Sequence, residues 1–203
     1  MAALVIALGA RYGAPSGEKL GAALKASARW SFLLFWLGYA GSSLAAVGGA
    51  KFRALARHGR DFGLAFASAH LVHLALVAWL LHIATTPFPR PQLIFLGIGV
   101  FWIYLLTILS VKPLAAKIDG RLLRMVRTVG VEYIALVFLV DFARNPLQGG
   151  AANLIAYLPF QILAVGALLL RVASALQRLS GWSGSRRLRE SVHYVLQPRW
   201  RNW

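Results

Sequence analysis

Three histidines, His70, His73 and His82, fall within one apolar stretch of the sequence, Phe62 to Ile83, which is long enough to cross a bilayer. Ionisable groups are rare inside membrane spans unless they bind a ligand or move protons. His70 and His73 are three residues apart, so they project from neighbouring angles of one helix. Counting about 1.5 Å per residue from Arg60 places this pair near the bilayer centre and His82 near the opposite surface.

The chemistry that such a pair suggests is ligation of a metal. Histidine is a common axial ligand of haem iron, and a single imidazole could equally hold a chlorin-type pigment. A buried histidine can also hydrogen-bond a serine or a carbonyl while uncharged, and the two interpretations are evenly balanced. The remaining histidines, His58 and His193, lie in a loop and in the C-terminal tail. We therefore expect at most single ligation of haem b or of a pigment, by His73 or His70.

Two carboxylates, Glu132 and Asp141, fall in a later apolar stretch, residues 128–142. For Glu132 we expect a salt link to Arg124 or Arg127, since all three lie near the headgroups. Asp141 has two equally supported roles. It could pair with a histidine, orienting the imidazole or relaying a proton, or it could cap the outer end of its span.

Composition shows what kind of elements carry these residues. The chain has 203 residues, of which 59% are hydrophobic and only 14% charged, and its mean hydropathy is +0.64. Soluble domains are roughly 45–50% apolar and about 25% charged. The excess indicates lipid-facing surface and hence an integral membrane protein. The absence of cysteine excludes disulfides, thiolate chemistry and iron–sulfur clusters.

The pattern predicts an all-α fold, a polytopic membrane bundle of five transmembrane helices. The expected spans are residues 30–49, 62–83, 92–111, 128–142 and 152–172. Residues 2–8 are apolar but too short to span, and are a candidate remnant of a sixth helix. The small residues of the first span favour close helix packing; they are Gly38, Ala40, Gly41, Ser42 and Ser43. Pro159 is expected to kink the fifth span.

Three regions follow from this layout. Residues 1–29 are an N-terminal polar or interfacial segment, residues 30–175 the transmembrane bundle, and residues 176–203 a basic tail. Breakers occur before and between the spans; they are Gly13, Pro15, Ser16 and Gly17, and the turn at residues 144–150.

The basic residues indicate sidedness rather than nucleic-acid binding. The formal charge of +16 is concentrated between apolar runs, in the loops 51–60 and 112–127 and in the tail. By the positive-inside rule these segments face the cytoplasm and contact lipid headgroups. We expect a bacterial-type inner membrane, a cytoplasmic C-terminus and no nucleic-acid partner. Five spans leave three basic residues on the outer side, Lys19, Lys25 and Arg29, and a sixth span before them would resolve this conflict.

Several short segments resemble the ferric-reductase-like transmembrane family. The sequence Arg60-Asp61-Phe62-Gly63-Leu64 leads to His73 ten residues after its glycine, which is the family's histidine position. Arg90-Pro91 followed by Leu96-Gly97-Ile98 and Trp102 is similar to the family's next span. Residues 118–123 resemble its basic approach to the fourth helix. The resemblance covers residues 29–175 and is closest to the haem-binding membrane subunit of periplasmic methionine-sulfoxide reductase systems.

The resemblance implies a helical bundle that clamps b-type haem, but this chain departs from the family's pattern. Where the family places a histidine at the start of the fourth helix, this chain has Arg127. The family's next histidine falls at Val140 or Asp141. Both ligands expected from that helix are therefore missing. Arg127 or Arg57 would be available for the haem propionates.

Two functional hypotheses result. The first is a transmembrane electron-transfer subunit that binds haem through His73 or His70 and passes electrons from quinone or a partner to an outer-face partner. The alternative is a haem-less divergent member that is a structural or assembly subunit of a larger membrane complex. Its small-residue faces and its basic, aromatic tail would dock on partner subunits or lipid; the tail aromatics are Trp182, Tyr194, Trp200 and Trp203.

A self-contained enzyme has no support in the sequence. It contains no nucleotide loop, no plausible Ser/His/Asp arrangement and no flavin or nicotinamide domain. At most the chain is a redox subunit without a catalytic domain of its own.

Overall fold

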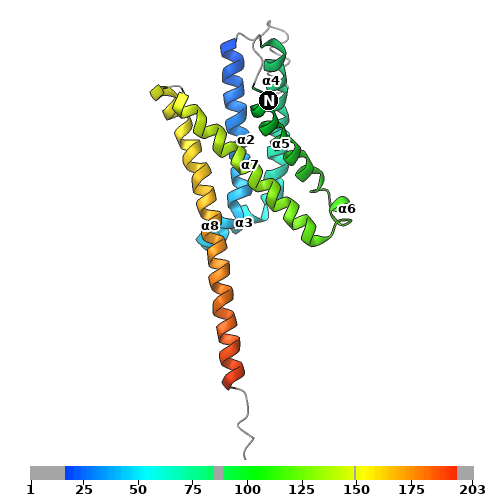
Figure 1. Ribbon diagram of the computed structural model, residues 1–203, viewed down its shortest axis with the longest axis vertical. Helices are drawn as coiled ribbons and strands as arrows, with labels where there is room; N and C mark the ends of the chain where they lie inside the picture. Colours follow the sequence, from blue (N-terminus) through cyan, green and yellow to red (C-terminus); the bar gives the residue numbers. More distant parts are fainter. Residues whose placement is uncertain (1–16, 85–88, 149, 196–203) are drawn as a thin grey trace, which may run out of the picture.

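The structure is a computed structural model that describes the backbone of residues 17–84, 89–148 and 150–195, and these residues contain helices and no strands. Side chains are described between residues 19 and 180, apart from 85–88, 112–113, 144–150, 152 and 178. In chain order (Figure 1) the elements are α2 (Gly17–Gly48), η1 (Gly49–Phe52), α3 (Arg53–Arg57), α4 (Gly59–Ile83), α5 (Arg90–Ile108), α6 (Lys112–Ala115), α7 (Gly120–Gln148) and α8 (Gly150–Val195).

The first helix is longer than the predicted span. Residues 17–29, expected to form a polar or interfacial segment, are the first turns of α2, and Leu20 is buried within it. This segment is rich in alanine, leucine and lysine, which are strong helix formers. The helix ends before Gly49, whose φ of +75° is a left-handed conformation that glycine adopts at little cost. The predictions for residues 2–8, Gly13, Pro15 and Ser16 concern positions outside the described part of the chain.

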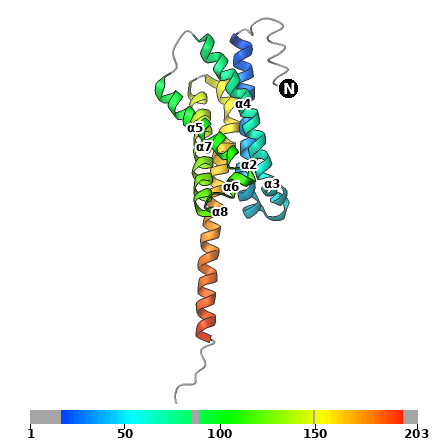
Figure 2. The same cartoon turned by 90° about the vertical axis from the view of Figure 1, so that its right-hand side faces the viewer.

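The long helix α2 is the centre of the bundle. It packs along α4 on one side and along α8 on the other, while α7 packs against α8 and α5. Figure 1 and Figure 2 show α7 running obliquely between the two ends of the bundle. The segments η1, α3 and α6 lie at the lower end, and α8 continues beyond the other helices in the same direction.

Within the described part of the chain, four helical segments are long and apolar enough to cross a membrane, namely Lys19–Arg57, Gly59–Ile83, Arg90–Ile108 and Asn153–Gln177. The prediction of an all-helical protein with several apolar spans is confirmed. The predicted count of five is not reached, because α7 does not meet the apolar criterion. Its charged residues lower the hydropathy of that segment; they are Arg124, Arg127, Glu132 and Asp141. A membrane crossing by α7 stays a prediction.

Large apolar side chains cover the outside of these helices. Ile155 is 74% exposed, and Ile94 and Leu169 are each 64% exposed. A soluble protein rarely leaves contiguous apolar surface of this kind in water. Lipid tails are as apolar as these side chains, so the exposed surface suits a membrane.

The interior is an aromatic cluster at the contacts of α2 with α4, α7 and α8. Phe32 is 2% exposed and meets Phe138 and Phe142 edge-on, with ring centroids 5.2 and 4.8 Å away. Phe35 extends the cluster to Phe66 of α4 at 5.3 Å. Edge-to-face pairs in this distance range are favourable beyond the area that they bury. This cluster holds together the helices that carry the candidate site.

Small residues let α2 approach its neighbours, as the sequence predicts. A methyl group added at Gly38 would lie 3.2 Å from the Gly59 carbonyl oxygen of α4, and one at Gly41 would lie 3.1 Å from the Leu55 side chain. Ser43 meets Ser174 of α8, with their hydroxyl oxygens 3.2 Å apart.

The helix α8 differs in extent from the predicted fifth span. It runs for 46 residues and includes Pro159 and the part of the predicted tail from residue 176 to 195. The predicted turn at 144–150 is reduced, because α7 continues to Gln148 and α8 begins at Gly150. At about 1.5 Å per residue α8 would measure about 69 Å, which is more than twice the roughly 30 Å of a bilayer's hydrocarbon core.

Candidate functional site

His73 is held by a serine of the neighbouring helix. Its Nδ1 lies 2.9 Å from the hydroxyl oxygen of Ser27 on α2. That hydroxyl donates its single proton to the Leu24 carbonyl at 3.0 Å. With that proton on the Leu24 carbonyl, the Nδ1–H of His73 donates to Ser27, and the lone pair of a neutral ring is then on Nε2. Metal-binding histidines commonly donate their other ring N–H to a hydrogen-bond acceptor, and the Ser27 hydroxyl oxygen would be that acceptor here.

His70 lies beside His73 on the same helix. The two ring centroids are 5.4 Å apart, and Phe66 lies 5.5 Å from His70 on its other side. Its Nδ1 is buried without a hydrogen-bond partner among the described residues. His82 is exposed in the last turn of α4, beside the ring of Trp79. The structure thus brings together the predicted midplane pair and leaves His82 apart.

Haem, which the family resemblance implies, can be tested against this donor set. A bis-histidine haem needs imidazoles on opposite faces of the macrocycle, supplied by two facing elements. Here His70, His73 and His82 all project from α4, and no cluster of three or more metal-ligating side chains occurs in the described ranges. The residues therefore do not fit a haem held between two histidines. The free Nε2 of His73 fits a single axial ligand.

Glu132 lies in a polar cluster that the sequence did not predict. One carboxylate oxygen forms an ion pair with Arg171 of α8, and the other accepts a hydrogen bond of 2.7 Å from the Tyr39 hydroxyl of α2. The guanidinium of Arg171 also lies over the Tyr39 ring, 4.5 Å from its centroid. The expected salt link of Glu132 to Arg124 or Arg127 is wrong. Arginines five and eight positions away on the same helix were poorer partners for Glu132 than a cation on a packed helix.

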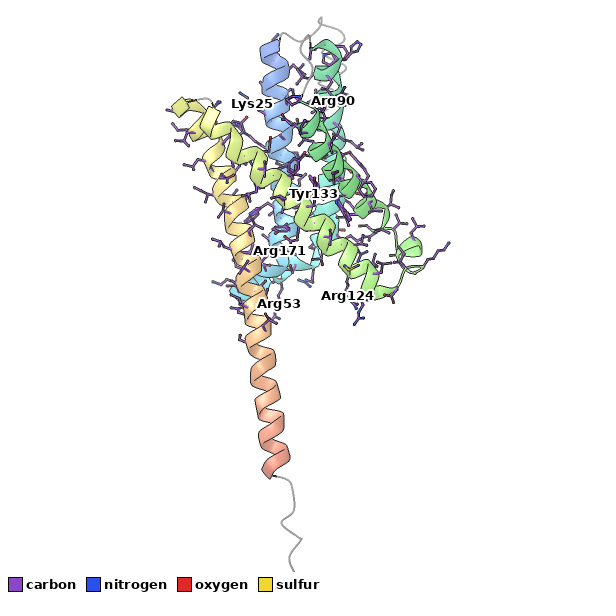
Figure 3. The ribbon with its side chains drawn as sticks, viewed as in Figure 1. Lys25, Arg53, Arg90, Arg124, Tyr133 and Arg171 are labelled. Atoms are coloured by element: carbon purple, nitrogen blue, oxygen red, sulfur yellow. The ribbon has the colours of Figure 1, made fainter. Side chains whose placement is uncertain are left out.

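A cavity of about 470 Å³ opens beside this cluster, between α2, α7 and α8. Its walls include both members of the ion pair and the hydroxyls of Ser42, Ser43 and Ser174. Figure 3 shows Arg171 on the half of α8 that lies within the bundle. Opposite charges in contact neutralise one another, which lowers the cost of placing either in a weakly polar interior. Because Tyr39, Glu132 and Arg171 lie on α2, α7 and α8, the cluster links these three helices.

Asp141 is half-buried in the second half of α7, next to the buried Phe142. For Asp141 the sequence left two roles open, pairing with a histidine and capping the outer end of its span, and both stay predictions. The hydrogen-bond partner found for His73 Nδ1 is Ser27. Helix α4 meets α2 much more extensively than α7. The partner of His73 is accordingly on α2.

Arg127 is an exposed residue of α7 whose guanidinium caps another helix. Its guanidinium donates a hydrogen bond of 2.8 Å to the Leu109 carbonyl at the C-terminus of α5. A cation at this position compensates the unsatisfied carbonyls of a helix end. Arg127 and Arg60 also line a second cavity, of about 300 Å³, between α2, α4, α5 and α7. This cavity reaches Phe66 but neither His70 nor His73.

Further polar ties join α2 to α8. Arg29 donates to the Ala156 carbonyl at 3.1 Å and lies over the Tyr157 ring, and the Trp36 indole donates to the Leu163 carbonyl at 2.9 Å. These bonds lie one turn to either side of Pro159, which cannot donate a backbone hydrogen bond within α8. The predicted topology leaves Arg29 on the outer side of the membrane. In the structure its guanidinium instead contacts α8 inside the bundle.

Sequence reasoning missed Ser27, Tyr39 and Arg171 as site residues. Arg171 carried a usable signal, because it interrupts an apolar run in the fifth predicted span. An isolated cation in such a run implies an acid on another span, and Glu132 was the available one. Ser27 and Tyr39 carried no such signal.

Comparison with known proteins adds no relative: no family model, no curated protein and no solved structure matches this chain. The class of protein therefore rests on the structure itself. This is a helical protein whose described residues include four candidate membrane spans, with polar ties between its helices.

Proposed function

We propose that this chain is a divergent, ferric-reductase-like membrane protein that works without haem, as a structural or assembly subunit of a larger membrane complex. A bacterial-type inner membrane with the C-terminus in the cytoplasm fits the concentration of basic residues in η1, α3, the α6 region and α8. The proposal rests on how the polar side chains inside the bundle are used.

The observation that carries the proposal is the pairing of these side chains across helices. Glu132 binds Arg171 and Tyr39, Arg127 caps α5, and the ring of His73 is hydrogen-bonded to α2. Each contact joins two or three helices. Groups arranged in this way stabilise one packing of the bundle, which is what a structural subunit needs.

The extension of α8 supports engagement of a partner. Beyond Gln177, where the apolar segment ends, α8 continues to Val195 away from the bundle (Figure 1). This segment contains Arg178, Arg186, Arg187 and Arg189. A basic helix leaving the membrane is suited to acidic headgroups or to an acidic surface of a partner subunit.

One experiment separates the proposal from the redox alternative. The protein is purified from cells supplied with haem precursor, and its absorption spectrum is recorded together with its mass by native mass spectrometry. We expect no Soret band and a complex of fixed stoichiometry that is lost when residues 181–203 are removed. A Soret band at one haem per chain would contradict the proposal.

A second candidate, a haem or pigment protein with one axial ligand, is favoured by one specific observation. The hydrogen bond from His73 Nδ1 to Ser27 leaves Nε2 as the free nitrogen. In that case a Soret band would appear, and it would be lost in His73→Ala but kept in His82→Ala. Ser27→Ala would shift the band or weaken haem retention, because the ring would lose its orienting partner.

A further inference from the structure

The cavity between α2, α4, α5 and α7 has a composition unlike the rest of the interior. Its walls are mainly apolar, with Phe35, Phe66 and Ile103 among them, yet two arginines line it, Arg60 and Arg127. No carboxylate contributes to its walls within the described residues. The nearest acid in sequence, Asp61, instead contacts His58 at 3.0 Å and is exposed. The cavity therefore carries an uncompensated positive charge.

The arginines retain donors for a ligand. Arg127 uses one NH2 group to cap the Leu109 carbonyl, and a guanidinium has five N–H donors in all. Arg60 is exposed in the first turn of α4. The start of that helix has no side-chain cap, so its first backbone N–H groups add to the positive potential. Together these groups would favour an anion, and a phosphate in particular.

The remainder of the cavity favours a hydrocarbon chain. Thr107 and Ser110 donate their hydroxyl protons to backbone carbonyls of their own helix region, at 2.7 and 2.8 Å, so they offer the cavity only lone pairs. Gly63 lines the cavity, and a methyl group added there would meet nothing within 4 Å. The space in front of Gly63 is therefore open. A soluble anion would leave this apolar space unfilled, whereas an acyl chain would fill it.

The position of the cavity suits a lipid in the leaflet on the side of the basic loops. Arg60 lies in the first turn of α4, just after α3. Figure 3 shows Arg53 and Arg124 at the lower end of the bundle. Basic pockets between membrane helices on that side commonly bind acidic headgroups. We propose that this cavity binds one acidic phospholipid, with its phosphate at Arg60 and Arg127 and the upper part of an acyl chain against Phe35, Phe66 and Ile103.

The test uses the full chain in detergent, titrated with phosphatidylglycerol or with phosphatidylcholine of the same acyl chains, and followed by native mass spectrometry. We expect one phosphatidylglycerol to bind about tenfold more tightly than phosphatidylcholine, because both lipids present a phosphate but the choline cation of phosphatidylcholine is repelled by the two arginines. Arg60→Gln and Arg127→Gln should each reduce this preference, and the double variant should remove it. The double variant Arg53→Gln/Arg124→Gln changes the net charge equally outside the cavity and should keep the preference.

A second pair of variants tests the cavity without touching its charge. Gly63→Leu fills open space and favours helix, so it should fold normally and weaken the binding of both lipids. Gly97→Leu, also in open space but outside the cavity, should leave binding unchanged. Equal affinity for both lipids, or a preference lost equally in Arg53→Gln/Arg124→Gln, would overturn the proposal. Glycerol phosphate binding as tightly as phosphatidylglycerol would also overturn it, since the ligand would then be a soluble phosphate.

Discussion

At the scale of single residues, partners on other helices decided the role of each ionisable group. Glu132 forms an ion pair with Arg171 and a hydrogen bond with Tyr39, rather than pairing with a cation of its own helix. An ion pair inside a membrane bundle gains little unless both charges are also hydrogen-bonded or packed on an aromatic ring. Tyr39 serves both charges. Its hydroxyl donates a hydrogen bond to Glu132, and its ring packs against the guanidinium of Arg171.

Breaking this pair should destabilise the bundle more when one charge is left than when both are removed. The side chains of Arg171 and Glu132 are 28% and 40% exposed, so the cost of a single variant is less than for a fully buried pair. For Glu132→Gln and for Arg171→Gln we expect losses of about 1–2 kcal/mol in the free energy of unfolding. The double variant should lose less than the sum of the two.

Thermal unfolding in detergent measures these differences. Arg124→Gln, at an exposed position of the same helix, is the control and should change stability by less than about 0.5 kcal/mol. If the loss in the free energy of unfolding of the double variant equals the sum of the two single losses, Glu132 and Arg171 are not coupled. The pair would then not stabilise the contact between α7 and α8.

At the scale of elements, the position of α7 follows from its packing against other helices rather than from its composition. It does not reach the hydropathy of a span, yet it contacts α5 and α8 along its length. It lies tightly against α5 at Gly130, where an added methyl group would lie 2.6 Å from a ring carbon of Trp102. The Tyr133 hydroxyl donates to the Phe95 carbonyl one turn further along the same contact, at 3.0 Å.

Gly130→Ala should therefore destabilise the protein although alanine is the better helix former. Trp102 and Leu106 would have to move, and overpacking of this kind costs about 1–3 kcal/mol. Gly97→Ala in α5 is the matched control. It meets nothing within 4 Å, so it should be neutral or stabilise by up to about 1 kcal/mol. A Gly130→Ala protein that melts at or above the wild-type temperature would contradict the observed α5–α7 contact.

At the scale of the whole molecule, the connections sort to two ends. The segments η1, α3 and α6 lie at the end from which α8 extends, and the last turn of α4 and the first turn of α5 lie at the other. Helix α4, with 25 residues or about 38 Å, is long enough to join the two sides of a bilayer.

This sidedness can be tested with single cysteines, because the chain has none of its own. Lys51→Cys, Lys117→Cys and Leu179→Cys, all at exposed positions, should react with a membrane-impermeant maleimide from one side of sealed vesicles. Arg90→Cys should react only from the opposite side. Detergent-opened vesicles are the control and should label all four. Lys51→Cys and Lys117→Cys reacting from opposite sides would refute the arrangement of α4 and α5 as two membrane crossings.

Local pattern was enough to predict much of the fold. Apolar runs of span length identified α4, α5, the second half of α2 and the apolar part of α8, since burying such runs in lipid depends only on composition and length. The pattern also predicted the close approach of α2 at Gly38 and Gly41. Helix boundaries were less predictable, because the start of α2 and the continuation of α8 depend on helix propensity without an apolar signal.

By itself, then, the sequence determined that the protein is helical, strongly apolar and basic, and that His70 and His73 share one helix. The tertiary structure alone decided the partners: Ser27 for His73, Arg171 and Tyr39 for Glu132, and the Leu109 carbonyl for Arg127. The physical reason is how far apart in the sequence the interacting residues lie. Periodicity and hydropathy are properties of a few neighbouring residues, whereas a hydrogen bond or ion pair forms between whichever groups the packing of helices brings within about 3 Å.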